Sequence, residues 1–145
     1  MKIDVAKLRE DAVLPVYQTA GAAGADLHAC IDAPIELQPL ERRMIPTGLA
    51  MSIPEGYEVQ IRARSGMSIK HGITMVNGIG TIDADYRGEV GVLIINLSQD
   101  VFTIEPGMRI AQMVVAKYEV TGWNVVESLD ETDRGAGGYG SSGSK

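Results

Sequence analysis

Alternation of apolar and polar residues dominates the middle of the chain. From Tyr57 to Arg64 the sequence YEVQIRAR places apolar side chains on one face and polar ones on the other, the two-residue period of a β-strand. The segment Glu89–Leu97 (EVGVLIINL) is more continuously apolar, which predicts a strand buried on both faces. Arg109–Tyr118 and Trp123–Val126 are further strand candidates.

Turn residues separate these segments, as in Pro54-Glu55-Gly56 and Glu105-Pro106-Gly107. Many short strands at intervals of about 8–12 residues predict an all-β sandwich, jelly roll or closed barrel. Helical periodicity is almost absent, but Ser65–His71 is a candidate for a short helix directly after a strand. Ser65 would then lie at the helix start, where free backbone N–H groups favour an anion.

Composition divides the chain into a folded part and a tail. We expect residues 1–128 to form one domain, because from about Leu129 onward Asp, Glu, Gly and Ser replace the apolar residues that could pack. Residues 129–145 are predicted to be a flexible arm that a ligand orders.

Charge and cysteine content narrow the function classes. The net charge of −6 opposes a general nucleic-acid binder, although a few local Arg and Lys side chains can still bind a small anion. The single cysteine, Cys30, excludes an intramolecular disulfide, and its apolar neighbours indicate a buried structural thiol. No apolar run approaches the ~20 residues of a membrane span, and no secretory signal precedes the domain. We therefore expect a soluble intracellular protein, cytoplasmic in a bacterium.

The segment Gly80–Gly88 (GTIDADYRG) carries the densest chemistry. Asp83 and Asp85 flank one alanine, so both carboxylates would project to the same face of an extended chain. A solvated turn is the simplest interpretation of such a pair. However, Ile82 suggests that Asp83 emerges beside the core, where it could hold a water against an electrophile. The Tyr86 ring could pack against a sugar.

Three common site types are excluded. Two histidines and one cysteine cannot build the usual zinc site, which also removes the zinc-dependent nucleobase deaminases. The chain has no P-loop motif. Residues 135–140 match G-x-G-x-x-G formally, but only five residues follow, so no helix of a dinucleotide site can begin there.

Three further segments offer groups for a phosphate or a cation. Arg64-Ser65-Gly66 combines a guanidinium, a hydroxyl and an open backbone, and Asp26 could organise a hard cation directly or through water. The arm from Arg134 to Gly143 holds one cation, one aromatic ring and two hydroxyls, a set suited to closing over a nucleotide. Each segment alone is also compatible with an ordinary turn.

In order and spacing, five segments resemble the five motifs of the trimeric dUTP diphosphatases (dUTPases). The resemblance covers essentially the whole chain, and five ordered motifs are highly specific. The segments are Ala23–Leu27, Ala63–Gly72, Asn77–Gly88, Pro106–Gln112 and Arg134–Gly143.

This resemblance implies a β-jelly roll in which three subunits share three active sites, and hydrolysis of dUTP to dUMP and pyrophosphate with Mg²⁺. It implies that Asp83 is the general base for in-line attack of water on the α-phosphorus, assisted by Gln112. The resemblance also implies that the uracil edge is contacted by Asn77, Gly80, Thr81 and Ile82, the uracil ring by Tyr139, and the deoxyribose by Tyr86. It implies that the phosphates are bound by Arg64, Ser65 and Gly66, that the γ-phosphate is bound by Arg134, and that the phosphate cradle is completed by Gly140, Ser141 and Ser142. Asp26 would lie near Mg²⁺.

Alternatives within and outside this family remain at this point. A dCTP deaminase-like enzyme shares the fold, but such enzymes generally lack the arm motif seen here. A dUTP-binding sensor without turnover would not need the intact Asp83, and a purely structural jelly roll would leave the motifs unexplained. One departure from the family is Tyr139, where phenylalanine is usual. Because the ring keeps its stacking surface, we expect activity to survive.

Overall fold

The structure, a computed structural model, describes residues 1–140. Within this range the chain forms ten strands and one short helix. In chain order these are β1 (Asp4–Lys7), β2 (Ala25–His28), β3 (Ile35–Leu37), β4 (Arg42–Ser52), β5 (Tyr57–Arg62), α1 (Ser65–His71), β6 (Ile73–Met75), β7 (Ile79–Ile82), β8 (Glu89–Asn96), β9 (Phe102–Ile104) and β10 (Arg109–Lys117).

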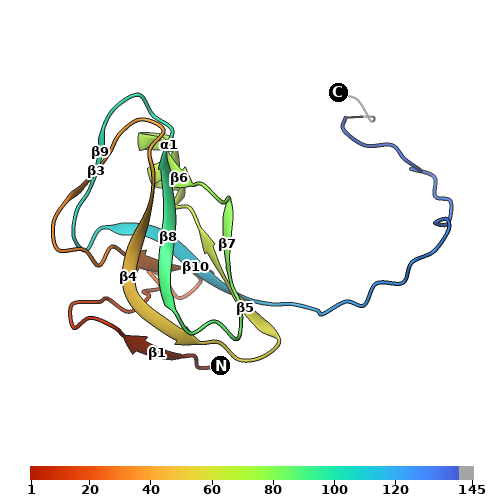
Figure 1. Cartoon of the computed structure of the whole chain (residues 1–145), viewed down its shortest axis with the longest axis horizontal. Helices are drawn as coiled ribbons and strands as arrows, with labels where there is room; N and C mark the ends of the chain where they lie inside the picture. Colours follow the sequence, from red (N-terminus) through yellow and green to blue (C-terminus); the bar gives the residue numbers. More distant parts are fainter. Residues whose placement is uncertain (141–145) are drawn as a thin grey trace.

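The strands pack as antiparallel sheets around one core. One sheet has the order β1-β4-β8-β6 and a second has the order β2-β10-β5-β7, while β3 and β9 form a two-stranded ribbon. Figure 1 shows β4 and β8 running side by side, with β10 and β5 behind them. This is the jelly-roll class of fold, so the predicted all-β jelly roll is confirmed.

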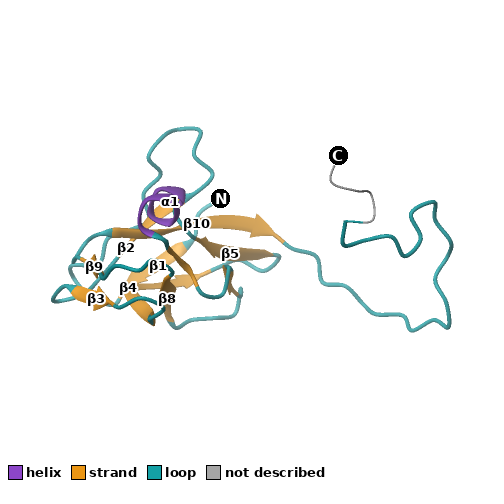
Figure 2. Cartoon of the chain, turned by 90° about the horizontal axis from the view of Figure 1, so that it is seen from above, coloured by secondary structure: helices purple, strands orange, loops and turns teal. Residues whose placement is uncertain are grey.

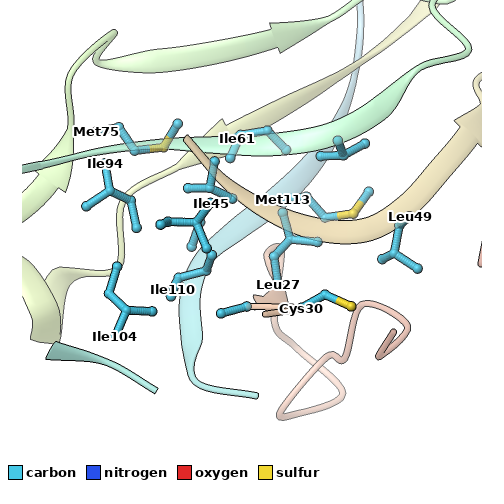
Figure 3. Close-up of a cluster of buried hydrophobic side chains, with 14 of the residues drawn as sticks. Leu27, Cys30, Ile45, Leu49, Ile61, Met75, Ile94, Ile104, Ile110 and Met113 are labelled. Atoms are coloured by element: carbon cyan, nitrogen blue, oxygen red, sulfur yellow. The ribbon is translucent and has the colours of Figure 1, made fainter. Parts of the chain in front are cut away.

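Aliphatic side chains from both sheets fill the space between them. Figure 3 shows Leu27 from β2, Ile45 and Leu49 from β4, Ile94 from β8 and Met113 from β10 pointing into this cluster. Leu27, Ile45 and Leu49 are completely buried. This dry interior fixes the register of β2, β5 and β10, and a one-residue slip would turn their polar faces inward.

Several predicted elements are confirmed with shifted ends. The strand expected from Tyr57 is β5, which ends at Arg62, and the helix Ser65–His71 is α1. The strand expected from Glu89 is β8, but its residues alternate between buried and half-buried positions. The prediction that both its faces are buried is therefore wrong for the single chain, because its outer face borders a cavity instead of a second layer.

The prediction of a strand at Trp123–Val126 is also wrong. Residues 119–140 leave the end of β10 and run away from the sheets without pairing with any strand (Figures 1 and 2). Trp123 is 89% exposed and Val125 is 96% exposed, so apolar character here does not reflect packing within the chain. The apolar pattern was read correctly, but no neighbouring strand completes the hydrogen bonds that define a sheet.

No helix within residues 1–140 has the length and apolar character needed to cross a membrane.

Candidate functional site

A cavity of about 260 Å³ opens where β6 and β7 part to join different sheets. Six of the predicted site residues line it, namely Asn77, Gly80, Thr81, Ile82, Asp83 and Tyr86. Gly80 leaves this wall open, because a Cβ at this position would make tight contacts of 3.3 Å with Asn77 Nδ2 and 3.3 Å with Ile61 Cβ. The volume lies below the roughly 300–1,000 Å³ of complete small-molecule sites, so this cavity alone has room for only part of a ligand of that size.

The loop that follows β7 is held by its own hydrogen bonds. The Tyr86 backbone N–H donates to Asp83 O at 3.1 Å, and Arg87 Nη1 donates to Ala84 O at 2.7 Å. The Tyr86 hydroxyl donates to Glu89 O at 3.0 Å. A Cβ at Gly88 would lie 2.3 Å from this hydroxyl oxygen, so glycine leaves the ring its position. The loop thus presents the exposed Asp83 carboxylate beside a fixed aromatic wall.

A second group of functional side chains surrounds Asp26 on β2. This aspartate is 7% exposed, and its Oδ1 lies 3.3 Å from Arg64 Nε while its Oδ2 accepts a hydrogen bond from Arg109 Nη1 at 3.2 Å. Arg64 Nη1 also donates to the backbone oxygen of Arg109 at 2.9 Å. Two cations around one anion leave a local excess of positive charge, which suits a phosphate.

Gln112 lies next to this charged group. Its Nε2 donates to Ala63 O at 3.4 Å, and its side chain lies against Gly24. A Cβ on Gly24 would come within 2.2 Å of Gln112 Oε1, so the glycine leaves room for the amide. Gln112 pairs with Asp26 on one side and with Arg62 on the other, which places it in the middle of the sheet.

The start of α1 completes the second group. Arg64 has extended backbone angles and precedes the helix, so Ser65 and Gly66 are its first residues, as the sequence predicted. The first N–H groups of a helix have no partner within it. Both residues are exposed, and nothing lies within 4 Å of a Cβ placed on Gly66, so a ligand can approach this backbone closely.

The cavity runs along β5, with Gly80 opposite Ile61, and its Asp83 lies beyond the end of β5 that is farther from the charged group. Val59 pairs with Ile82, just before Asp83, whereas Arg62 pairs with Gln112 and precedes Arg64. The six residues of extended chain from Val59 to Arg64 span about 16 Å. A base must lie within about 3 Å of the proton that it removes, and this span therefore separates the carboxylate of Asp83 from the charged group around Arg64 in one chain.

The predicted arm residues lie away from both groups. Arg134 Nε donates to Gly137 O at 2.7 Å within a turn of the arm, and Tyr139 is fully exposed, with a backbone φ of 51°. Gly140 follows Tyr139 with a positive φ of 87°. Figure 2 shows this segment well separated from the sheets. Ser141 and Ser142 lie outside the described residues.

The residues around Asp26 do not fit a directly coordinated metal ion. Both of its carboxylate oxygens are paired with guanidinium groups, which repel a cation. Within residues 1–140, no group of three or more His, Cys, Asp or Glu side chains converges as a metal site would require. Any Mg²⁺ at this position would have to be brought by a ligand that carries its own negative charge.

His28 borders the charged group on β2, where it pairs with Arg109. Its Nδ1 is buried and has no hydrogen-bond partner among the described residues. Burial lowers the pKa of His28, and the charges of Arg109 and Arg64 lower it further against the opposing effect of Asp26. The imidazole is therefore neutral at pH 7 and adds no charge to the group.

Sequence reasoning missed two residues of this site, Arg109 and Gly24. Both lie inside the quoted motifs, but nothing in the local pattern shows that Arg109 pairs with an aspartate 83 positions earlier. The role of Gly24 depends equally on a side chain from a distant strand.

Three comparisons with known proteins agree with one another. A family model described as dUTPase matches residues 10–143. A Roseobacter denitrificans protein named deoxyuridine 5'-triphosphate nucleotidohydrolase is 59% identical over 131 residues, 90% of this chain and 86% of that protein.

Solved structures of similar proteins share the fold. A mutant dUTPase of Staphylococcus bacteriophage 80alpha, described with dUpNHpp, has a TM-score of 0.84 and 28% identity, covering 98% of each chain. A mutant dUTPase from phage phi11 of S. aureus, described with a coordinated structural Mg(II) ion, has a TM-score of 0.81 and 26% identity, covering 90% of this chain and all of that one.

We predict that Gly24→Ala displaces the Gln112 amide while the fold persists. The new methyl group overlaps Oε1, which is the flexible end of a side chain and can rotate away from Ala63 O. A crystal structure of the variant should show this hydrogen bond broken, with little change in melting temperature. Gly21→Ala is the control, because a Cβ there meets nothing within 4 Å. An unmoved Gln112 would contradict the prediction.

We predict that His28 makes the protein less stable below about pH 6.5. The pKa of His28 in the folded state lies below its unfolded value, so the unfolded chain binds a proton first and stability rises with pH between the two values. Urea unfolding at a series of pH values should show a steeper loss of stability on acidification for the wild type than for His28→Gln. Equal slopes would show that His28 does not titrate differently on folding.

Proposed function

The chain belongs to the dUTPase family, and from this premise we propose that it hydrolyses dUTP to dUMP and pyrophosphate by attack of water on the α-phosphorus. In this proposal Asp83 is the general base that orients the water and accepts its proton. The observation that carries it is the position of Asp83, which is exposed on a loop held by backbone contacts at the rim of the base-sized cavity. Cells use this reaction to keep uracil out of DNA and to supply dUMP.

The cavity supports selection of uracil and deoxyribose. Asn77 and the backbone of β7 would read the uracil edge, where cytosine presents the opposite pattern of donors and acceptors. Gly80 brings the backbone close, so the extra methyl group of thymine would collide with it. The Tyr86 ring, fixed by its bond to Glu89 O, would lie under the sugar and exclude a 2′-hydroxyl.

The charged group supports triphosphate binding. Arg64, with Ser65 and Gly66 at the start of α1, would bind the α- and β-phosphates, and Gln112 would help to hold the α-phosphate and the water. Arg134 and Tyr139 of the arm would close over the γ-phosphate and the uracil ring, with Gly140, Ser141 and Ser142 completing the cradle. Closure excludes bulk water and fixes the reacting groups.

We propose that the complete site forms between copies of the chain in a homotrimer. The separation of Asp83 from Arg64 along β5 supports this, because it is more easily bridged when the two residues come from different chains. A second support is the segment that leads from β10 to the arm, where Val120, Trp123 and Val125 are almost fully exposed. A neighbouring copy would supply both the missing half of the site and a surface for the arm.

Mg²⁺ enters this proposal with the substrate. Bound to the triphosphate, the ion offsets phosphate charge and favours one arrangement of the three phosphates. Asp26 would meet it through water at most, since both carboxylate oxygens pair with arginine.

The proposed function predicts release of pyrophosphate from dUTP alone when dUTP, dCTP, dTTP and UTP are presented in parallel with Mg²⁺. Consumption of dCTP would indicate a deaminase-like enzyme, and binding of dUTP without any release would indicate a sensor.

Asp83→Asn serves as the matched variant in the same assay. It should bind dUTP and lose at least about a hundredfold in kcat, the effect expected for loss of a general base. Asp85→Asn is the control, because it removes an exposed carboxylate two residues away that is no part of the proposed chemistry. Near-normal turnover by Asp83→Asn would remove Asp83 from its role.

The composite site predicts complementation between two inactive variants. Asp83→Asn and Arg64→Gln impair opposite halves, so unfolding and refolding them together should form mixed trimers in which about one site in four is intact. Pyrophosphate release should rise from near zero to about a quarter of the wild-type rate. A site built from one chain would give no rise.

The control for complementation pairs Asp83→Asn with Asn77→Ala. These residues line the same cavity of one chain, so every cavity in a mixed trimer carries one of the two substitutions, as it does in the parent trimers. Activity of this mixture above the mean of its parents would contradict the assignment of the two halves.

A further inference from the structure

An irregularity in β10 turns Arg109 toward the phosphate-binding group. Arg109 pairs with His28, and Ala111 pairs with Leu27. β10 therefore advances by two residues where β2 advances by one, and the register shifts between these pairs. In a regular strand Arg109 would share the inward face of Ala111 and Met113, which are buried in the core. The extra residue reverses this alternation and places Arg109 on the face of Gln112, which is how bulges re-aim side chains beside functional sites.

Arg109 and Arg64 each pair with one oxygen of the buried Asp26 carboxylate. Asp26 Oδ2 accepts from Arg109 Nη1, and Asp26 Oδ1 faces Arg64 Nε. The side chain of Asp26 is 11% exposed, compared with 45% for Arg109. Within residues 1–140, Arg64 Nη1 donates to Arg109 O, whereas Arg64 Nη2 has no partner and remains available to a phosphate.

We propose that Arg109 is a positioning residue that acts through Asp26 on Arg64, and the proposal rests on the hydrolase function above. By binding Asp26 Oδ2, Arg109 prevents the carboxylate from forming a bidentate ion pair with Arg64. That arrangement would occupy the guanidinium edge that the phosphates need. Without Arg109 the buried Oδ2 would lack a partner, and Asp26 would turn both oxygens toward Arg64.

The test is a double-mutant cycle of Arg109→Gln with Arg64→Gln, measured as kcat/KM for dUTP. Arg109→Gln alone should lower kcat/KM by about tenfold to a hundredfold, the range expected when a reacting group is slightly misplaced. In the Arg64→Gln background it should change kcat/KM by less than about twofold, because its effect runs through Arg64. If the two substitutions lowered kcat/KM by independent factors that multiply in the double variant, Arg109 would act on the substrate itself, which would overturn the proposal.

Two further variants separate positioning from loss of charge or of fold. Arg62→Gln removes an exposed arginine that pairs with Gln112 in the sheet register and bonds to Gln60 instead of Asp26, so it should retain wild-type kcat/KM. Arg109→Lys keeps a cation for Oδ2 and should restore most of the activity. A wild-type rate for Arg109→Gln, or a loss in Arg62→Gln equal to that in Arg109→Gln, would overturn the proposal.

A readout without turnover separates this proposal from the proposed function. The Nε–H resonance of Arg64 should shift in the NMR spectrum of ligand-free Arg109→Gln, and an unchanged resonance would overturn the role of Arg109. If the wild type hydrolysed no dUTP, the proposed function would fail whatever the spectrum showed. If the wild type hydrolysed dUTP and Arg109→Gln were equally active, the proposed role of Arg109 would fail while the proposed function would stand.

Discussion

The antiparallel pairing of β5 with both β7 and β10 is the constraint on which the site depends. It fixes Asp83 beyond one end of β5 and Arg64 beyond the other, and the buried side chains between the sheets prevent either strand from slipping. A rigid sheet therefore holds these two groups of side chains apart within one chain. The proposed association of copies would answer this constraint, because each chain would then supply one group to a site shared with a neighbour.

Charge distribution follows the same division. The chain carries a net charge of −6, yet the group around Asp26 carries two arginines against one buried carboxylate. The proposed binding of a triphosphate relies on the placement of Arg64 in this group, and the more distant exposed acids oppose it little because salt screens them. The carboxylate is also what keeps the two cations together, since guanidinium groups at this separation would otherwise repel one another.

How much the sequence revealed depended on the range of the interactions involved. Strand β5, strand β10 and helix α1 could be predicted because alternation and turn residues are local signals. The residues of the cavity were also predictable, because Asn77 to Tyr86 are contiguous and belong to one recognisable motif. The pairing of Asp26 with Arg109 was not, because it needs the register of β2 with β10 and the bulge within it. The strand predicted at Trp123–Val126 failed for another reason: the segment is apolar, but no strand among the described residues pairs with it.

Glycine and the arm then explain how a stiff scaffold accommodates a substrate. Gly80 and Gly24 remove side chains where the backbone or the Gln112 amide must approach closely, so both half-sites are formed before a ligand arrives. Preformed halves lower the ordering cost of binding, but they leave the nucleotide open to water. Closure must come from a segment that the core does not hold, and the stretch after Lys117 has this property, because its large apolar residues are exposed. In the proposed trimer, this stretch would complete the site of another copy.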